Sequence, residues 1–134
     1  MYLLDTNVVS ELRKPRPNPA VVKWLTQTPN AQLFISAVTV GEIQSGIEIT
    51  RVQDHEKAAA IERWLDDVVR TAQIINLDAQ IFRLWGKLMH QRSSTLIEDA
   101  MIAASALSQQ LTVVTRNVTD FSPFGVSVFN PFET

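Results

Sequence analysis

The sequence predicts a three-layer α/β/α sandwich around a central, mostly parallel sheet of about five strands. Short apolar runs alternate with amphipathic stretches along the whole chain, which is typical of parallel strands joined by crossover helices. The chain has 134 residues, of which 46% are hydrophobic and 19% are charged. This length suits one domain over residues 1–134, with enough apolar residues to form a core unaided.

Five strands are expected where short apolar runs are bounded by polar residues or turn signals. The first run ends at Asp5, and the later ones are separated by helical patterns. The predicted strands are 2–4, 33–35, 74–77, 111–114 and 126–129.

The helices are predicted from apolar periodicity and from their end signals. Pro15 stops the first helix, Asn18 followed by Pro19 is an N-cap and N1 pair, and Asp54 and Asp78 can each cap a helix. The alanine-rich stretch before the fourth strand supplies another helix. The predicted helices are 8–14, 19–25, 38–49, 55–70, 79–88 and 98–109, with a short helical turn at 119–121.

Composition excludes several classes of function. There are 12 Lys and Arg against 14 Asp and Glu, giving a net charge of −2, so bulk positive charge does not attach this protein to nucleic acid. The absence of cysteine excludes disulfides, thiolate zinc sites and cysteine nucleophiles. No apolar run is long enough to span a bilayer, and the first residues lack the basic region of a signal peptide. A cytoplasmic protein without a membrane partner is expected.

Four carboxylates are predicted to lie at one edge of the sheet. Asp5 ends the first strand, and Asp120 follows the fourth. Glu42 and Asp99 lie in the first turns of two helices. Because crossover helices run antiparallel to the strands, their N-termini lie at the carboxyl edge of the sheet, where ligands gather.

Each acid also has an ordinary structural interpretation. Asp5 and Asp120 can be helix caps. Glu98 and Asp99 can simply favour a helix N-terminus, and Glu42 can be a solvated helix residue. Those interpretations explain the acids singly, but they do not explain why all four meet at one edge.

A divalent cation explains the coincidence of acids. Clustered carboxylates repel one another unless they are protonated or neutralised by cations. Oxygen ligands without cysteine favour Mg²⁺, with Mn²⁺ as the substitute, over Zn²⁺. Such a site suits phosphodiester hydrolysis, in which a metal activates water. Thr6, Thr115 and Asn117 flank the acids as candidate supports of the site, although turn chemistry explains them equally well.

Four sequence blocks carry a resemblance to a known family. They stand in that family's order and reach across nearly the whole chain. The blocks are LDTNVVSEL at 4–12, VTVGEI at 38–43, DAMIAA at 99–104 and VTRNVTDF at 114–121. Together they resemble the PIN-domain ribonucleases, and the chain length is similar to the VapC and FitB type of toxin in that family.

The resemblance implies a PIN-like sandwich and a metal-dependent endoribonuclease that is the toxin of a type II toxin–antitoxin pair. By matching blocks, Asp5, Glu42, Asp99 and Asp120 would be the catalytic acids and ligands of Mg²⁺ or Mn²⁺. Thr6 and Asn117 would support them. The loop 91–97 has no glycine, unlike many relatives, and Glu98 adds a carboxylate.

The resemblance also implies partners. They would be an RNA substrate, a cognate antitoxin, a second copy in a homodimer that forms a larger hetero-oligomer with the antitoxin, and promoter DNA bound only through the antitoxin. Arg13, Lys14 and Arg116 are candidates for RNA contact, although a solvated basic surface explains them as well. Helix 54–70 is a candidate cover of a partner-binding groove, to which Trp24, Leu25 and the Ile43/Ile47 face could contribute, with core packing as the alternative.

Other functions remain open on the residues alone. A phosphoaspartyl phosphatase would have a second Asp two positions after Asp5, where this chain has Asn7. A receiver module would have a Lys after the fourth strand, where this chain has Arg116. A non-catalytic PIN-like protein-binding module is the main alternative, although burying unneutralised carboxylates without a function is costly.

Overall fold

The computed structural model describes residues 1–133 and contains a five-stranded sheet in which every pairing is parallel. The strand order is β3-β2-β1-β4-β5. Leu3 of the central strand is in register with Phe34 on one side and Val113 on the other. The strands are β1 (Tyr2–Leu4), β2 (Leu33–Ser36), β3 (Gln73–Ile75), β4 (Thr112–Val114) and β5 (Val128–Phe129).

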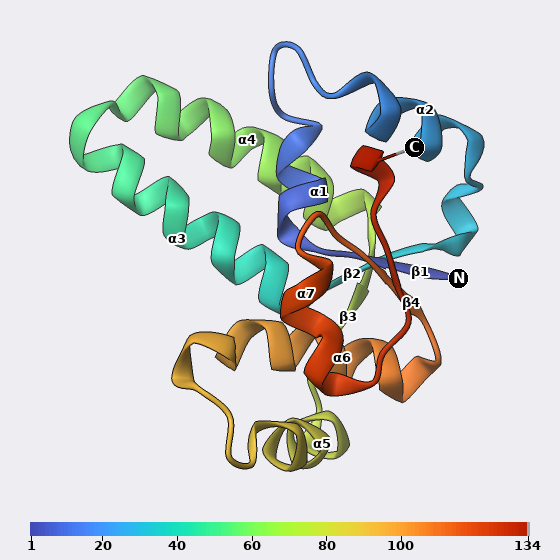
Figure 1. Ribbon diagram of the computed structural model, residues 1–134. Coiled ribbons are helices and arrows are strands. Elements are labelled where there is room, and N and C mark those ends of the chain that lie inside the picture. Colours follow the sequence, from blue (N-terminus) through green and yellow to red (C-terminus); the bar gives the residue numbers. More distant parts are fainter. Residues whose placement is uncertain (134) are drawn as a thin grey trace.

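Helices cover both faces of this sheet (Figure 1). The long pair α3 and α4 packs on one side, and α5 with α6 packs on the other. The helices are α1 (Thr6–Glu11), α2 (Pro19–Gln27), α3 (Ala37–Gln53), α4 (His55–Thr71), α5 (Ala79–Met89), α6 (Ile97–Gln109) and α7 (Val118–Phe121). Short 3₁₀ turns occupy Asn30–Gln32, Ser94–Leu96, Ser122–Phe124 and Pro131–Glu133. The arrangement confirms the predicted α/β/α sandwich.

Two hydrophobic cores lie on the two faces of the sheet, because successive strand residues point in opposite directions. Leu3 is fully buried in the core under α5 and α6, together with Ala103 of α6. Leu4 lies in the other core, together with Ile47 of α3 and Leu65 of α4. The small alanine side chains on α6 let that helix approach the sheet closely, which fixes the position of the acids at its N-terminus.

The predicted capping residues form the expected bonds. Asn18 Oδ1 accepts a hydrogen bond from the amide of Ala20 at 2.9 Å, with Pro19 at the first helical position. Asp54 accepts from the amide of Lys57 at 3.0 Å. Asp78 likewise caps α5 through the amide of Ile81 at 3.0 Å. Local sequence signals therefore set these three helix starts.

Three strands are shorter than predicted, of which β4 lacks only residue 111 and begins at Thr112. Pairing of β3 stops where Ser36 meets Ile75, because β2 ends there and α3 begins. Residues 76–77 therefore lead to the cap of α5 instead of extending the strand. At the sheet edge, only Val128 and Phe129 of β5 are in register with β4.

Two helices differ from the predicted bounds by more than two residues. The first begins at Thr6 instead of residue 8, because Asp5 acts as its N-cap, and it ends at Glu11 instead of residue 14. The third continues to Gln53, because its second half packs along α4. No helix within residues 1–133 combines the length and apolar character needed to cross a bilayer.

Candidate active site

The fold brings the predicted acids to the carboxyl edge of the sheet. Asp5 follows β1, Glu42 lies in α3, Asp99 lies in the first turn of α6 and Asp120 lies in α7. These elements converge near the centre of Figure 1. The charges influence one another, because Asp5, Glu42 and Asp120 all raise the pKa of Asp99. Glu98 belongs to the same cluster and acts on Glu42 and Asp99.

Asp5 is held by three donors at the bottom of the site, where only 5% of the residue is exposed. Its Oδ1 accepts from the amide of Thr6 at 2.8 Å. Its Oδ2 accepts from Nδ2 of Asn7 at 3.0 Å and from the hydroxyl of Thr115 at 2.8 Å. Burial raises the pKa of Asp5, and these hydrogen bonds oppose that rise. The carboxylate is thus fixed in one orientation.

Thr6, the residue that follows Asp5, connects Asp5 to Glu42 through a hydrogen bond. The Thr6 hydroxyl donates to Oε1 of Glu42 at 2.7 Å and lies 3.0 Å from the hydroxyl oxygen of Thr39, which is fully buried. Burial raises the pKa of Glu42, and the nearby charges of Asp5 and Glu98 raise it further. Thr6 therefore ties the first and second acidic blocks together, as its predicted supporting position requires.

Asp99 carries the strongest perturbation in the cluster. Burial raises its pKa from 3.8 to about 7, and the charges of Asp5, Asp120, Glu42 and Glu98 contribute to the rise. Within residues 1–133 its carboxylate accepts no hydrogen bond, so no protein donor offsets its burial. A proton or a cation must stabilise this side chain near neutral pH.

The oxygen atoms available in the site are of the chemical type that binds a hard divalent cation. They are carboxylate and hydroxyl oxygens, the ligand type that Mg²⁺ and Mn²⁺ take. In the described part of the chain, no three carboxylate or imidazole groups are placed closely enough to share one ion as they stand. Asp5 is locked by hydrogen bonds, whereas Asp99 is free of them, so Asp99 is the side chain that can adjust.

The fourth block contributes mainly through Thr115. This residue is fully buried, and its oxygen also accepts from the backbone amide of Asn117 at 2.9 Å. The side chain of Asn117 forms no hydrogen bond with the described residues, and Asp120 is exposed at the rim. Thr115 thus has a clear structural contact with an acid, whereas Asn117 acts here only through its backbone.

Sequence reasoning did not assign a supporting role to Asn7 or Thr39. Asn7 donates to Asp5 and, at 3.2 Å, to the hydroxyl of Thr115. The Asp-Thr-Asn run at 5–7 was a usable signal. When Asp5 caps a helix that begins at Thr6, the next two residues, Thr6 and Asn7, lie close to the Asp5 carboxylate. Thr39 offered no local signal, since its role depends on the approach of α1 to α3.

Two hollows flank Glu42. One, of about 220 Å³, is also lined by Thr6 and Arg13, and the other, of about 420 Å³, is also lined by Glu98. Arg13 is exposed and forms no ion pair with residues 1–133. A cationic side chain is therefore available on one side of the acids, while the opposite side is acidic.

The other two cations predicted to contact RNA face an internal acid. Lys14 Nζ lies 2.9 Å from Oε1 of Glu11, and Nη2 of Arg116 lies 4.0 Å from the same oxygen. Glu11 is only 5% exposed. The fold thus places these two cations beside a buried carboxylate, in contrast to Arg13.

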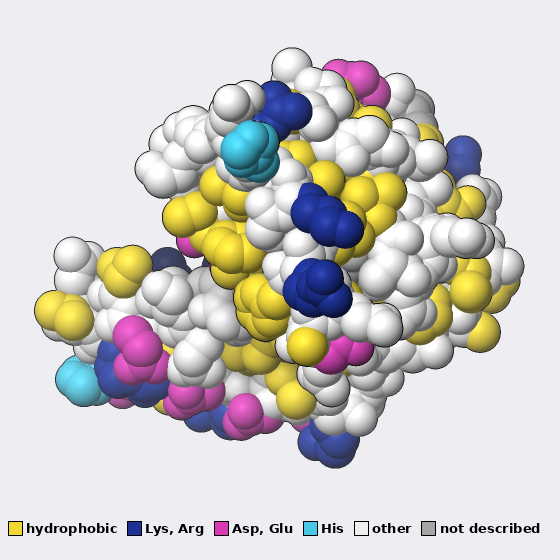
Figure 2. All heavy atoms as spheres, turned by 90° about the horizontal axis from the view of Figure 1, so that it is seen from below, with side chains coloured by type: hydrophobic (Ala, Val, Ile, Leu, Met, Phe, Trp, Pro, Cys, Tyr) yellow, Lys and Arg dark blue, Asp and Glu magenta, His cyan; other side chains and the backbone are white. Residues whose placement is uncertain are grey.

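The helix α5 presents exposed basic and aromatic side chains. Phe82 is 43% exposed, and Arg83 and Lys87 are exposed on the same helix. No acidic residue occurs between Asp78 and Glu98 in the sequence. Figure 2, which views the molecule from the side where α5 lies, shows hydrophobic and basic side chains together beside a hollow.

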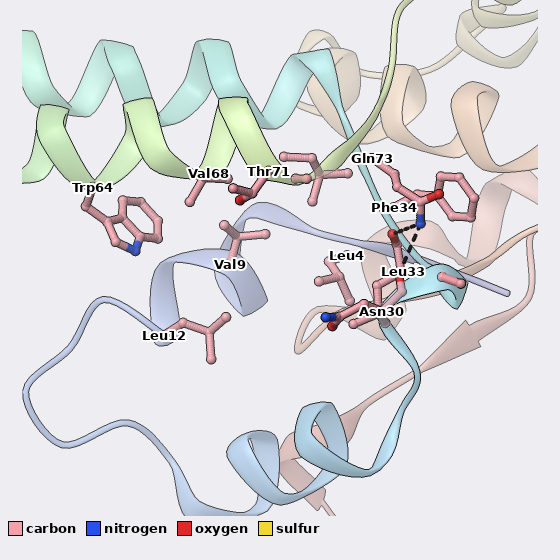
Figure 3. A pocket seen from close by; sticks show the side chains of 13 residues that line it. Leu4, Val9, Leu12, Asn30, Leu33, Phe34, Trp64, Val68, Thr71 and Gln73 are labelled. Carbon is pink, nitrogen blue, oxygen red and sulfur yellow. Dashed lines mark hydrogen bonds between the residues drawn. The ribbon is translucent and has the colours of Figure 1, made fainter.

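A larger apolar pocket of about 480 Å³ opens between α1, α4 and the sheet (Figure 3). Leu4 forms part of its floor, directly before Asp5 in the chain. Val9 of α1 and Trp64 and Val68 of α4 point into it (Figure 3). Helix α4, which was predicted to cover a partner-binding groove, therefore lines an apolar pocket.

The other candidate groove residues pack elsewhere. Trp24 and Leu25 are half-buried against the core beneath α2, and neither lines this pocket. Trp24 contacts the rings of Tyr2 and Phe129, with centroids 5.0 and 5.3 Å away. Aromatic packing at the edge of the sheet thus accounts for Trp24.

Comparisons with known proteins agree with this geometry. The family described as "PIN domain" matches residues 2–122. A "VapC ribonuclease Y4jK" from Sinorhizobium fredii is 31% identical, over 99% of this chain and 99% of its own. The "Crystal Structure of FitAcB from Neisseria gonorrhoeae" has a TM-score of 0.87 at 30% identity and covers all of both chains.

A further solved structure is a "Toxin-antitoxin complex from Klebsiella pneumoniae", with a TM-score of 0.68 at 27% identity over all of both chains. The family match spans all four acidic positions, from Asp5 to Asp120. Sequence, fold and the position of the acids at the sheet edge therefore agree that the chain belongs to the PIN-domain family.

Proposed function

We propose that this protein is a divalent-metal-dependent endoribonuclease and the toxin of a type II toxin–antitoxin pair. The observation that carries the proposal is Asp99, which stands without a hydrogen-bond donor among other acids at the sheet edge and has its pKa raised to about 7. A divalent cation would remove the repulsion within this cluster. The ribonuclease and toxin names of its relatives support the same conclusion.

In this proposal Asp5, Glu42, Asp99 and Asp120 hold Mg²⁺, or Mn²⁺ in its place. The bound metal supplies a water of lowered pKa and neutralises charge on the phosphate during hydrolysis. The protein's own task is to keep oxygen atoms in place. Asp5 is fixed by its three donors and Glu42 by Thr6. Asp99, free of donors and with its pKa raised to about 7, would have to lose its proton before it could bind the ion.

RNA is the proposed substrate, and its phosphates need cations that are free to bind them. Arg13 meets that condition beside Glu42, whereas Lys14 and Arg116 face Glu11. Arg83 and Lys87 add two exposed cations on α5, the helix that packs against α6. These local cations allow a protein of net charge −2 to attract RNA next to an acidic centre.

The cognate antitoxin is the proposed occupant of the apolar pocket. A pocket lined by Leu4, Val9, Trp64 and Val68 suits apolar side chains from a partner segment. None of the acids lines the pocket itself, but Leu4 directly precedes Asp5, so a segment that continued past Leu4 would reach them. Antitoxin binding would thereby cover the site, and promoter DNA would be bound through the antitoxin.

The proposal is tested by RNA cleavage with purified, antitoxin-free protein. We expect cleavage with Mg²⁺ or Mn²⁺, none with EDTA, and none from the Asp99→Asn variant in either metal. Asp66→Asn is the matched control, because Asp66 is an exposed acid on α4 away from the site. Mn²⁺ binding is measured in parallel by calorimetry. A wild-type protein that neither binds Mn²⁺ nor cleaves total cellular RNA would be a non-catalytic PIN-like binding module.

A further inference from the structure

Glu11 anchors a cluster of contacts behind the proposed active site. It is the last residue of α1, and only 5% of it is exposed. Its Oε2 accepts from the backbone amide of Asn18 at 2.8 Å, and its Oε1 accepts from Nζ of Lys14 at 2.9 Å. These bonds lower the pKa of Glu11, so its charge is present throughout the neutral range. A carboxylate that is charged at neutral pH thus lies within 4.0 Å of Arg116, in the loop after β4.

Arg116 lies between this carboxylate and an aromatic ring, with 51% of its side chain exposed. Its Nη2 lies 4.0 Å from Oε1 of Glu11, and its Cζ lies 3.8 Å from the centroid of the Phe132 ring. A guanidinium over an aromatic face is attracted by the ring's quadrupole. Glu11 of α1 and Phe132 therefore contact the same side chain, although they are far apart in sequence.

The backbone of Arg116 is connected to the proposed site through one residue, Asn7. Its amide donates to Oδ1 of Asn7 at 3.1 Å. With the oxygen of this side-chain amide engaged, Nδ2 faces the opposite way and donates to Asp5 at 3.0 Å and to Thr115 at 3.2 Å. A reversed amide would present an oxygen to the Asp5 carboxylate and repel it. The amide of Arg116, together with Asp5 and Thr115, therefore holds Asn7 in the orientation in which it acts as a donor.

We propose that Arg116 is a positioning residue, whose side chain is clamped by Glu11 and Phe132 so that its backbone holds Asn7 toward Asp5. The inference rests on the proposed nuclease function and refines one part of it. Arg116 thereby acts on the acids indirectly, by orienting Asn7 toward Asp5, and does not bind RNA phosphate. Residues that orient ligands of a metal in this way affect activity or metal affinity by roughly 10- to 100-fold.

The test compares Arg116→Gln, Glu11→Gln and the double variant with wild type, and Lys23→Gln is the control for loss of an exposed cation. We expect Arg116→Gln and Glu11→Gln each to lower kcat by roughly 10-fold or more with little change in KM. The double variant should be no worse than Arg116→Gln, because both act through one contact. The salt dependence of RNA binding in EDTA should not change.

The opposite pattern would overturn the proposal. If Arg116 binds RNA, Arg116→Gln raises KM and reduces the salt slope of binding by about one. Glu11→Gln would then tighten RNA binding, since it releases the arginine. The sign of the Glu11→Gln effect therefore separates the two roles.

A readout independent of cleavage keeps this inference separate from the proposed function. The side-chain amide signals of Asn7 in ¹⁵N NMR should shift in Arg116→Gln and stay unchanged in Lys23→Gln. Unchanged Asn7 signals in Arg116→Gln would refute positioning even if the enzyme is active. If wild-type protein cleaves nothing, the proposed function fails while the NMR comparison still decides the role of Arg116. If Glu11→Gln does not fold, the test uses Arg116→Gln, which changes an exposed side chain, together with Phe132→Leu.

Discussion

The hydroxyl of Thr115 donates a 2.8 Å hydrogen bond to Oδ2 of Asp5, a residue 110 positions earlier in the chain. The two residues directly follow the neighbouring parallel strands β4 and β1, and both are buried. This bond therefore joins the first and fourth acidic blocks at the carboxyl edge of the sheet. It also offsets part of the cost of burying the Asp5 carboxylate.

Replacing this donor should affect both stability and activity. Thr115→Val keeps the shape of the side chain but leaves Asp5 Oδ2 with Asn7 as its remaining donor. Loss of a buried hydrogen bond to a charged group should lower the free energy of unfolding by about 1–3 kcal/mol. Cleavage should fall by roughly 10- to 100-fold, because the ligand loses its orientation. Urea unfolding and RNA cleavage rates measure the two effects.

Thr112→Val is the matched control for this substitution. Thr112 begins the same strand, far from the acids, and its side chain forms no hydrogen bond with residues 1–133. It should change neither cleavage nor stability appreciably. Equal effects of the two variants would show that β-strand packing, and not the bond to Asp5, is responsible.

The raised pKa of Asp99 predicts how stability depends on pH. Its pKa is about 7 in the folded protein, and the ordinary value of 3.8 applies to the unfolded chain. Between these pH values the folded state therefore binds more protons than the unfolded state. Stability of the metal-free protein therefore falls as pH rises through this window. The raised pKa values of Asp5 and Glu42 act in the same direction. Thermal unfolding in EDTA should show a lower Tm at about pH 8 than at about pH 5.

Asp99→Asn should flatten that pH profile, because the amide does not ionise. Mn²⁺ should restore the Tm of wild-type protein at high pH, since the ion binds deprotonated carboxylates. The same variant should lose most of this gain. A metal-free protein whose Tm rises steadily across the window would show that burial and the neighbouring acids do not raise the pKa of Asp99 in the folded state.

The position of the acids was predictable because it depends on strand ends and helix starts. Asp5 ends an unbroken apolar run, and Asp99 begins an apolar helix, so each signal is local. Parallel topology then brings them to one edge. The cap residues Asn18, Asp54 and Asp78 were predictable for the same reason, since each bonds an amide two or three positions away.

Contacts between distant elements were beyond the reach of local patterns. Thr39 meets Thr6 only because α1 packs against α3, and Arg116 meets Glu11 only after the sheet has formed. From the sequence, Arg116 is one exposed cation among several. The apolar pocket likewise depends on how α4 lies over α1, so Trp64 and Trp24 look alike in sequence but differ in position.

The apolar pocket predicts a variant that separates inhibition from catalysis. Val68→Glu places a charge among Leu4, Val9 and Trp64, which an apolar antitoxin segment cannot accommodate without desolvating it. Antitoxin affinity should fall by at least an order of magnitude while RNA cleavage by the free protein persists. Calorimetric titration with the cognate antitoxin measures the first, and a cleavage assay measures the second.

Val69→Glu is the control for this substitution. Val69 follows Val68 on the same helix, is 43% exposed and does not line the pocket. It should leave antitoxin binding intact. If both variants bind the antitoxin as wild type does, the partner uses a different surface.

Arg13 should contribute to RNA binding through its charge alone. It lines the hollow beside Thr6 and Glu42 and has no ion-pair partner within residues 1–133, so Arg13→Gln removes a cation without exposing a buried acid. RNA binding in EDTA should weaken for all sequences, and the slope of log affinity against log salt should drop by about one. Arg63→Gln, an exposed change on α4, should alter neither. A lower kcat with an unchanged salt slope would instead place Arg13 among the groups that act on the reacting phosphate.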